Sequence, residues 1–221
     1  MINRLLAKRY RPEKGWDPIP MDYARAYADA EYAGFRPGLV KDLERVVGPL
    51  EEKRVLDLGG RPGHYSIDFA RVGADVVWHD VSRNYESIAK AAAVDAGVSI
   101  HFSLGYLEDA AKFEDERFDL VFNRICWRYC QADSGFADLV YRLVAPGGAG
   151  YVDSHHADKA QKHGWSATAI MYRLNARFGI KIGHPPPPGR ITSLLRRNAV
   201  SSLSTEWSTE QNERVLFIKV R

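Results

Sequence analysis

The sequence predicts a doubly wound α/β fold built on a mostly parallel sheet of seven strands. Short apolar segments alternate along the chain with amphipathic helical segments, as in right-handed βαβ crossovers that place helices on both faces of a sheet. The final two strand segments, at 199–207 and 214–220, are joined by a few turn residues, so they are expected to pair as an antiparallel hairpin. We therefore expect one α/β core that ends in an antiparallel pair.

The composition indicates one domain with short additions. A chain of 221 residues with 45% hydrophobic content can bury a sizeable core, and roughly 100–200 residues per domain is typical. The formal net charge of +3 is too small to indicate a nucleic-acid partner, because a dedicated binder usually shows a concentrated basic face. Basic residues do cluster near both ends of the chain (Arg4, Lys8, Arg9, Arg11 and Lys14; Arg190, Arg196 and Arg197).

Cysteine content and hydropathy predict a cytoplasmic protein by default. Cys126 and Cys130 are too few for a disulfide framework or a four-ligand zinc site, so buried free thiols are expected and no metal is. The N-terminus lacks the apolar run of a signal peptide, and no segment approaches the ~20 apolar residues of a membrane span.

Residues 1–34 are expected to form an arm and a helix ahead of the core. The arm, residues 1–20, is basic and contains several prolines, so it is either a solvated tail or a lid over a substrate. A helix is predicted to begin at Asp22, and a second one runs from about Leu39 to Gly48. The first helix is expected to present one face with Tyr23, Ala26, Tyr27 and Ala30.

The stretch Arg54–Ala70 predicts a ligand cradle. An apolar strand, 54–58, enters the turn Gly59–Gly63, and a helix begins directly after it. Glycines let a ligand approach the backbone, and the N–H groups in the first turn of a helix are unpaired. Asp57 stands at the strand end, where a carboxylate repels phosphates and attracts a cationic or hydroxyl-bearing group.

The remaining core elements follow in βαβ order. Strands are predicted at 75–80, 98–104, 118–123 and 149–153, and helices at 82–97 and 136–144. Pro146-Gly147-Gly148 is expected to be the turn before the strand at 149–153. Ligands in such sheets bind outside the carboxyl ends of the strands, where Asp57, Asp80, Asn123 and Asp153 are expected to lie.

The segment before the hairpin differs in character. Helical spacing at 165–178 is followed by four prolines at 185–188, which make a stiff connection, and by a short helix at 191–197. The chain shows no internal repeat.

Four segments resemble the motifs of the class I S-adenosylmethionine-dependent methyltransferases. They are D-L-G-G-R-P-G at 57–63, the acidic Asp80 that ends the second strand, F-D-L-V-F-N at 118–123, and L-V-A-P-G-G at 143–148. The resemblance covers roughly residues 35–221 and implies a Rossmann-like sheet, with 157–190 as a candidate substrate-cap insertion. Other nucleotide-binding families fit less well, because the chain has no G-K-[ST] and no third glycine at the dinucleotide spacing.

The resemblance implies S-adenosylmethionine as the cofactor. Asp80, some twenty residues past the glycine loop, would accept hydrogen bonds from the ribose hydroxyls, although a carboxylate there can also cap a helix. Asp57 would face the methionine amino group. The cofactor-binding residues implied in this way are Asp57, Gly59, Gly60, Gly63, Asp80, Tyr106, Leu107 and Asn123.

The chain departs from the family pattern at two positions. Arg61 replaces the middle glycine of the first motif, and we expect Pro62 to hold Arg61 in an extended conformation that needs no glycine. Tyr106 replaces the acid often found after the third strand. Adenine recognition would then fall to the backbone near Leu107 and to Tyr106 itself, unless Tyr106 is an aromatic residue of the rim.

The first motif also resembles that of the ribosomal RNA 2′-O-methyltransferases, which favour a Pro-Gly pair there. Those enzymes rely on a lysine and an aspartate near the ends of the fifth and fourth strands. This chain has Asp153 and Asn123 or Arg124 at those places, so a ribose hydroxyl would lack an activator.

Catalysis is expected to depend mainly on in-line positioning, with a general base added if the acceptor is a hydroxyl. His155 is the expected base and Asp153 would orient it, the alternative being a surface histidine in a loop. Arg124, Trp127 and Tyr129 follow the fourth strand and are expected to bind the substrate, unless the two aromatic residues pack against Trp165 and Met171.

The sequence thus predicts a methyltransferase for a small molecule, such as a sugar or another metabolite with a hydroxyl group. Nucleic acid is not the expected partner, and the oligomeric state is open. The alternatives are an RNA or protein methyltransferase that uses the basic arm, and a non-catalytic binding subunit that keeps the fold, which Arg61 and Tyr106 would favour.

Overall fold

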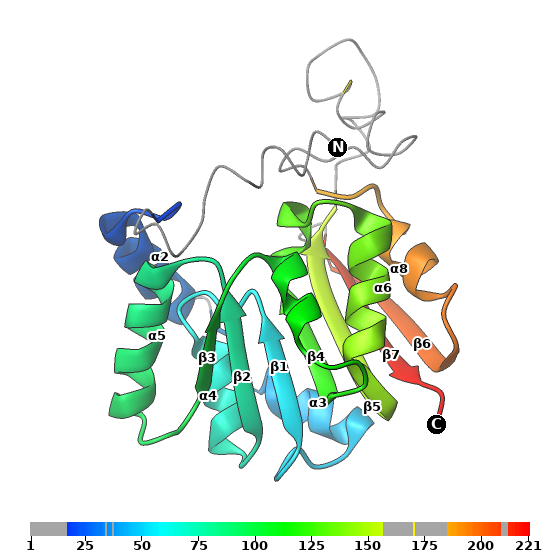
Figure 1. The fold of residues 1–221 in the computed structure, drawn as a ribbon, viewed down its shortest axis with the longest axis horizontal. Coiled ribbons are helices and arrows are strands. Elements are labelled where there is room, and N and C mark those ends of the chain that lie inside the picture. Colours follow the sequence, from blue (N-terminus) through cyan, green and yellow to red (C-terminus); the bar gives the residue numbers. More distant parts are fainter. Residues whose placement is uncertain (1–16, 34, 37, 157–169, 171–184, 209–211) are drawn as a thin grey trace.

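The computed structural model describes residues 17–33, 35, 36, 38–156, 170, 185–208 and 212–221. In this part of the chain, seven strands form one sheet in the order β3-β2-β1-β4-β5-β7-β6 (Figure 1). The strands are β1 (Arg54–Leu58), β2 (Asp75–Asp80), β3 (His101–Leu104), β4 (Phe118–Arg124), β5 (Val144–His155), β6 (Val200–Trp207) and β7 (Asn212–Lys219).

The strand directions confirm the predicted fold class. β1 pairs in parallel with β2 and β4, and the parallel pairing continues to β3 on one side and β5 on the other. β7 is antiparallel to both β5 and β6, which confirms the C-terminal hairpin. The predicted turn at Pro146-Gly147-Gly148 is wrong, because these residues lie inside β5 as an irregularity opposite β4. A Cβ on Gly148 would lie 2.8 Å from the carbonyl oxygen of Asp119, so the chain can pass this close to β4 only without a side chain.

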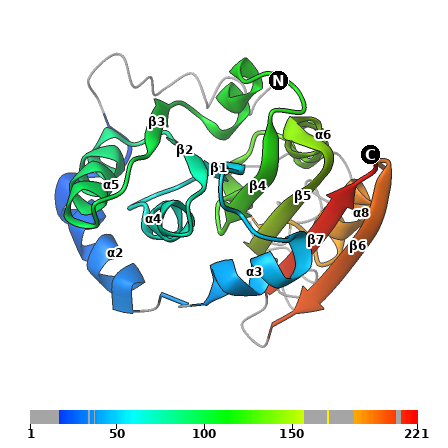
Figure 2. The same ribbon diagram turned by 90° about the horizontal axis from the view of Figure 1, so that it is seen from below.

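Helices cover both faces of the sheet, as predicted. Val121 of β4 faces one side, while its neighbours Leu120 and Phe122 face the other. α3 and α4 pack on the second side and α6 packs on the first (Figure 2). The helices are α2 (Met21–Ala33), α3 (Leu39–Val47), α4 (His64–Arg71), α5 (Arg83–Asp95), α6 (Asp133–Leu143) and α8 (Arg190–Leu195), with 3-10 turns η2 (Leu107–Lys112) and η3 (Trp127–Tyr129).

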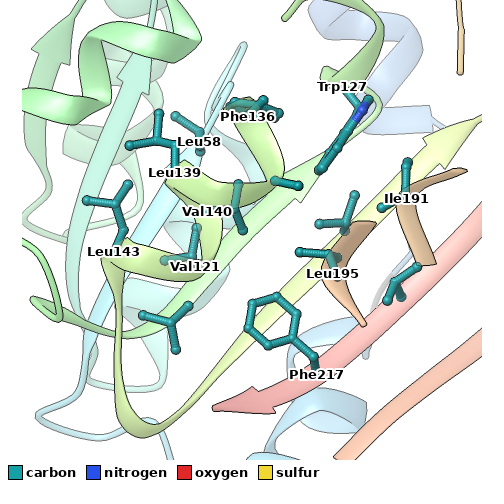
Figure 3. Packing of buried hydrophobic residues seen from close by; sticks show 14 of the residues in the cluster. Leu58, Val121, Trp127, Phe136, Leu139, Val140, Leu143, Ile191, Leu195 and Phe217 are labelled. Atoms are coloured by element: carbon teal, nitrogen blue, oxygen red, sulfur yellow. The ribbon is translucent and has the colours of Figure 1, made fainter. Parts of the chain in front are cut away.

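The larger core cluster ties the C-terminal part of the chain to the sheet. Leu139, Val140 and Leu143 of α6 point toward the sheet and α8, and Phe217 of β7 packs into the same cluster (Figure 3). Trp127 of η3 closes its upper edge. This packing fixes the segment after β4 against the core, and that segment borders the site described below.

The first helix has the expected bounds but a different buried face. Ala24 and Ala28 are buried, whereas Ala26 and Ala30 are exposed. Small side chains allow α2 to lie close to α5, where Ala24 joins Tyr85 and Ala89 in one cluster. α2 therefore lies beside α5 near the carboxyl ends of the strands (Figure 1).

Several predictions fall on residues that the structure does not describe. The arm at 1–16, the helix at 165–178 (apart from residue 170) and most of the candidate cap at 157–190 lie outside the described residues. None of the described helices is both long and apolar enough to cross a membrane.

Candidate active site

The loop after β1 is packed so tightly that a side chain at its glycine positions would clash with neighbouring residues. The backbone N–H of Gly59 donates to the carbonyl of His79 at 2.7 Å, which ties the loop to β2. A Cβ on Gly59 would lie 2.6 Å from Cys126 Sγ, and one on Gly60 would lie 2.2 Å from Trp78 Cδ1. Gly63 has φ +89° and a Cβ there would lie 2.7 Å from the Ala89 side chain.

Arg61 has a backbone conformation that usually favours glycine. Its φ is +49°, in the left-handed region, so the expected extended conformation is wrong. Two contacts hold it there against the preference imposed by Pro62: its N–H donates to Asp80 Oδ2 at 3.1 Å, and its carbonyl accepts from Trp78 Nε1 at 3.0 Å. The left-handed region costs a non-glycine residue about 1 kcal/mol. The loop thus keeps its shape, and the guanidinium is directed toward α2.

Two carboxylates stand at the ends of adjacent strands. Asp57 of β1 is buried and accepts from Ser66 Oγ at 2.6 Å. Burial raises the pKa of Asp57 to about 6, although the hydrogen bond from Ser66 opposes this shift. Asp80 of β2 is 7% exposed and accepts from the N–H groups of Arg61 and Ser82, and burial raises its pKa as well.

A cavity of about 370 Å³ opens over these strand ends. Its volume lies within the ~300–1,000 Å³ range of sites for small ligands. The sheet contributes the loop after β1 and the end of β2, the β3–η2 connection forms one wall, and the N-terminal segment covers the cavity. The lining residues are Pro18, Ile19, Tyr23, Tyr27, Gly59, Arg61, Asp80, Val81, Tyr85, Gly105, Tyr106, Leu107, Ile125, Cys126 and Tyr129.

The wall at Tyr106 and Leu107 is fixed from behind by a buried histidine. His79 Nε2 lies 2.8 Å from the Tyr106 carbonyl oxygen, and its Nδ1 lies 2.9 Å from Ser103 Oγ. Burial lowers the pKa of His79 to about 4, so the ring is neutral at neutral pH. The predicted contacts Tyr106 and Leu107 both line the cavity.

The end of β4 carries a buried amide and a strained residue. Asn123 donates from Nδ2 to the Leu58 carbonyl at 2.7 Å, while its Oδ1 has no hydrogen-bond partner among the described residues. Ile125 has φ +61°, which is unusual for a β-branched side chain, and its N–H donates to the Asp153 carbonyl at 2.6 Å. This bend turns the chain from β4 toward the cavity.

A chain of ion pairs runs beneath α2 from the glycine loop to β5. Glu31 of α2 lies 2.9 Å from Arg61 Nη2 and 3.4 Å from Arg124 Nη1. Arg124 Nε in turn lies 3.4 Å from Asp153 Oδ2, which Arg214 also approaches at 3.7 Å. Tyr27 accepts a hydrogen bond from Arg61 through its hydroxyl oxygen.

The two residues expected in base catalysis lie apart from this cavity's lining. Asp153 is 2% exposed, and its carboxylate accepts from Asn212 Nδ2 at 2.9 Å in addition to its arginine contacts. His155 is half-buried at the end of β5, where its backbone is paired with Asn212. Asp153 is thus held by Arg124 and by the β7 residues Asn212 and Arg214.

The three residues expected to bind substrate occupy different surroundings. Tyr129 is 66% exposed and lines the cavity. Trp127 is fully buried against Phe136 and donates from Nε1 to Asp133 at 2.8 Å, so it belongs to the core. Arg124 lies in the chain of ion pairs, with its guanidinium 5.2 Å from the centre of the Tyr65 ring.

The cysteines are buried free thiols, as predicted. Cys126 also lines the cavity, and burial raises the pKa of its thiol to about 12.

Sequence reasoning missed the residues that α2 contributes. Tyr23, Tyr27 and Glu31 are spaced four residues apart, which places them on one helical face. That spacing marks a shared face but does not show that the face turns toward the strand ends. Glu31 in particular carries no motif by which it could have been recognised.

Comparison of the sequence with known proteins identifies a matching family model and several related proteins. A family model described as a methyltransferase domain matches residues 55–148. Ubiquinone biosynthesis O-methyltransferases of Chelativorans sp. (strain BNC1) and Rhizobium etli are 28% and 31% identical over 144 residues, or 65% of this chain. That match covers 53% and 54% of the two relatives, so the chain aligns with about half their length.

Solved structures agree on the fold. An O-methyltransferase family protein of Burkholderia thailandensis superposes with a TM-score of 0.61 at 20% identity, over 90% of this chain and 60% of that one. An S-adenosylmethionine-dependent methyltransferase of Mesorhizobium loti superposes with a TM-score of 0.57 at 18% identity, over 80% and 96%.

Proposed function

The chain belongs to the class I S-adenosylmethionine-dependent methyltransferases, and we propose that it transfers a methyl group from S-adenosylmethionine to a small-molecule acceptor. The observation that carries the proposal is the cavity over the ends of β1 and β2, where a glycine loop meets the buried carboxylates Asp57 and Asp80. The matched relatives named above as O-methyltransferases favour a hydroxyl acceptor, such as that of a sugar or another metabolite.

The residues present fit this cofactor. The Asp80 carboxylate lines the cavity, where it would accept hydrogen bonds from ribose hydroxyls in addition to those from the backbone. Asp57 would hold the methionine ammonium group, and the unpartnered Oδ1 of Asn123 offers a second acceptor at the same end. Gly59, Gly60 and Gly63 keep side chains out of the cradle, and Tyr106 and Leu107 would contact the adenine.

Methyl transfer requires the protein mainly to position the acceptor and the cofactor relative to each other. S-adenosylmethionine supplies a methyl group on a sulfonium, whose thioether leaving group is neutral. The chain's own residues then need to hold the acceptor in line with that methyl group, and such positioning is worth effective molarities of ~10⁵–10⁸ M. The covering residues Tyr23 and Tyr27 would exclude water from the cavity.

Acceptor binding is assigned to the residues beside the cavity. Tyr129 lines it and would contact the acceptor directly, whereas Trp127 would act from the core by supporting that wall. Arg124 would bind or orient the acceptor through its guanidinium. The basic arm and helix, 1–34, and the segment 157–190 are our candidates for the lid and the substrate cap.

His155 is our candidate general base, with Asp153 as its proposed orienting partner. A general base contributes ~10²–10⁴-fold when the acceptor is a hydroxyl. His155→Ala should therefore lower kcat within that range, and an unchanged kcat would show that positioning alone suffices.

Isothermal titration with S-adenosylmethionine tests the core of the proposal. Asp80→Ala should weaken binding about 100-fold, since it removes hydrogen bonds made by a charged acceptor. Asp75→Ala is the matched control, because Asp75 is an exposed carboxylate at the opposite end of the same strand. Failure of the wild-type protein to bind the cofactor would favour the non-catalytic interpretation.

A further inference from the structure

Two arginines from the core share one glutamate from α2. Arg61 comes from the glycine loop and Arg124 from the end of β4, yet Glu31 Oε1 lies 2.9 Å from one guanidinium and 3.4 Å from the other. The side chains of Arg61, Arg124 and Glu31 are 11%, 21% and 17% exposed. A carboxylate thus occupies a largely buried position between two guanidinium groups.

The two arginines depend on Glu31 to different degrees. Arg124 has a second anionic partner in the core, because Asp153 lies 3.4 Å from its Nε. The guanidinium of Arg61 contacts α2 through an ion pair with Glu31 and through a hydrogen bond and a cation–π contact with Tyr27. When α2 moves away, the Arg61 guanidinium loses these two partners and becomes free to bind another anion, while Asp57 and Asp80 act on it through electrostatics.

This arginine pair borders the space where the acceptor must sit. Arg61 lines the cavity together with Asp80, and Arg124 directly precedes the cavity residue Ile125. α2 covers the same cavity through Tyr23 and Tyr27. A ligand that enters beneath α2 would thus meet both guanidinium groups next to the proposed cofactor site.

The geometry points to an acceptor that carries a carboxylate, which Arg61 and Arg124 bind in place of Glu31 when α2 lifts. Glu31 is then an internal stand-in for the acceptor's carboxylate, and the arginine pair selects for anionic acceptors. Planar guanidinium groups suit this task because they pair with carboxylates through two parallel hydrogen bonds. This inference rests on the proposed function and names the chemical class of its acceptor.

Titration of the full-length protein with benzoate and with neutral benzamide tests the carboxylate site, in the presence of S-adenosylhomocysteine. Benzoate should bind at least tenfold more tightly than benzamide. Glu31→Gln should tighten benzoate binding about tenfold, because it removes the competing carboxylate. Arg61→Gly and Arg124→Gln should each weaken benzoate binding about tenfold or more, whereas Arg45→Gln, in an exposed ion pair with Asp42, should leave it unchanged.

Equal binding of benzoate and benzamide, or no effect of Glu31→Gln on benzoate affinity, overturns the inference. Circular dichroism and thermal melts accompany each variant, and Glu31→Asp, which keeps the competing charge, should bind benzoate less tightly than Glu31→Gln. If Glu31→Asp and Glu31→Gln bind benzoate equally, competition by the carboxylate is contradicted.

A second titration separates the acceptor's carboxylate from that of the cofactor. S-adenosylhomocysteine carries the methionine carboxylate and 5′-methylthioadenosine does not. Arg61→Gly should either weaken the binding of these two ligands by the same factor or leave the binding of both unchanged. If it weakens only the binding of S-adenosylhomocysteine, the arginines bind the carboxylate of the cofactor and the inference is overturned. Failure of the proposed function appears separately, as absence of S-adenosylmethionine binding to the wild-type protein.

Discussion

The proposed methyl-donor half of the site (the donor half) and the proposed methyl-acceptor half (the acceptor half) are held together by different kinds of contact. In the donor half (Asp57, the loop backbone 59–63 and Asp80), backbone groups make most of the hydrogen bonds, such as Gly59 N–H to the His79 carbonyl. In the acceptor half (Glu31, Arg61, Arg124 and Asp153), charged side chains join α2 to the core, and Arg124 is 93 residues from Glu31. Arg61 belongs to both halves, its backbone to the first and its side chain to the second.

The difference indicates which half the fold itself specifies. Backbone hydrogen bonds form wherever the strands and the loop adopt this arrangement, and they need no particular side chain. The sequence is constrained mainly where the closely packed backbone leaves no room for a side chain. Ion pairs between distant elements require both partners and can be exchanged for a ligand. We therefore expect the donor half to be rigid and the acceptor half to be open to rearrangement.

The largest effect should come from crowding the donor half. Gly60→Ala places a Cβ 2.2 Å from Trp78 Cδ1, so the free energy of unfolding should fall by about 3 kcal/mol in urea denaturation. Gly135→Ala is the control, because a Cβ at this helical position has no atom within 4 Å and should be neutral or slightly stabilising. Equal effects of the two substitutions would contradict the tight packing of the loop.

A smaller effect is expected from the buried charge of Asp57. The raised pKa of Asp57 stabilises the folded protein, and this stabilisation is complete at pH values below the unfolded-state pKa near 3.8. It is lost as the pH rises through the folded-state pKa of about 6. Asp57→Asn should therefore be more stable than the wild type by about 2 kcal/mol at pH 7 and not at pH 4. The stability difference between the two proteins reports on Asp57 alone. His79, whose lowered pKa makes stability rise with pH, contributes equally to both proteins.

The same carboxylate should make cofactor binding depend on pH. If the ionised Asp57 holds the methionine ammonium group, wild-type affinity for S-adenosylmethionine should fall about tenfold between pH 7 and pH 5, as titration calorimetry can measure. Asp57→Asn should bind weakly and lose this part of the pH dependence. If Asp57→Asn is less stable than the wild type at pH 7 and binds the cofactor normally, Asp57 does not hold the methionine ammonium group.

The smallest effect concerns the ion pair that joins the two halves. A double-mutant cycle of Glu31→Gln and Arg61→Gly should give a coupling free energy of about 1–2 kcal/mol in urea denaturation, since both side chains are largely buried. The exposed pair Asp42–Arg45 should give less than about 0.5 kcal/mol in the matching cycle. Equal coupling in the two cycles would mean that Glu31 and Arg61 do not hold α2 over the site.

The donor half was predictable because its signals are local. The strand 54–58, the glycine turn and the carboxylates at the strand ends are read from periodicity and residue type within one βαβ unit. The structure brings Asp57, Asp80 and the loop together as expected, and Tyr106 and Leu107 line the cavity. Their roles toward a cofactor stay predictions until binding is measured.

The acceptor half was predictable only in part. Arg124, Trp127 and Tyr129 are consecutive or nearly so after β4, yet one joins an ion-pair chain, one is buried in the core and one lines the cavity. Which way each side chain turns depends on the bend at Ile125 and on packing against α6, and neither is visible in the sequence.

By itself the sequence determined the order of strands and helices, the antiparallel hairpin, the glycine loop and the carboxylates at the strand ends, because each depends on neighbouring residues. The tertiary structure alone decided that Arg61 keeps a left-handed backbone despite Pro62, and that Glu31 lies between Arg61 and Arg124. The reason is physical: contacts with Asp80 and Trp78 outweigh the local preference at Arg61, and the packing of Ala24 and Ala28 brings α2 over the site. Such contacts between distant residues leave no periodic trace in the chain.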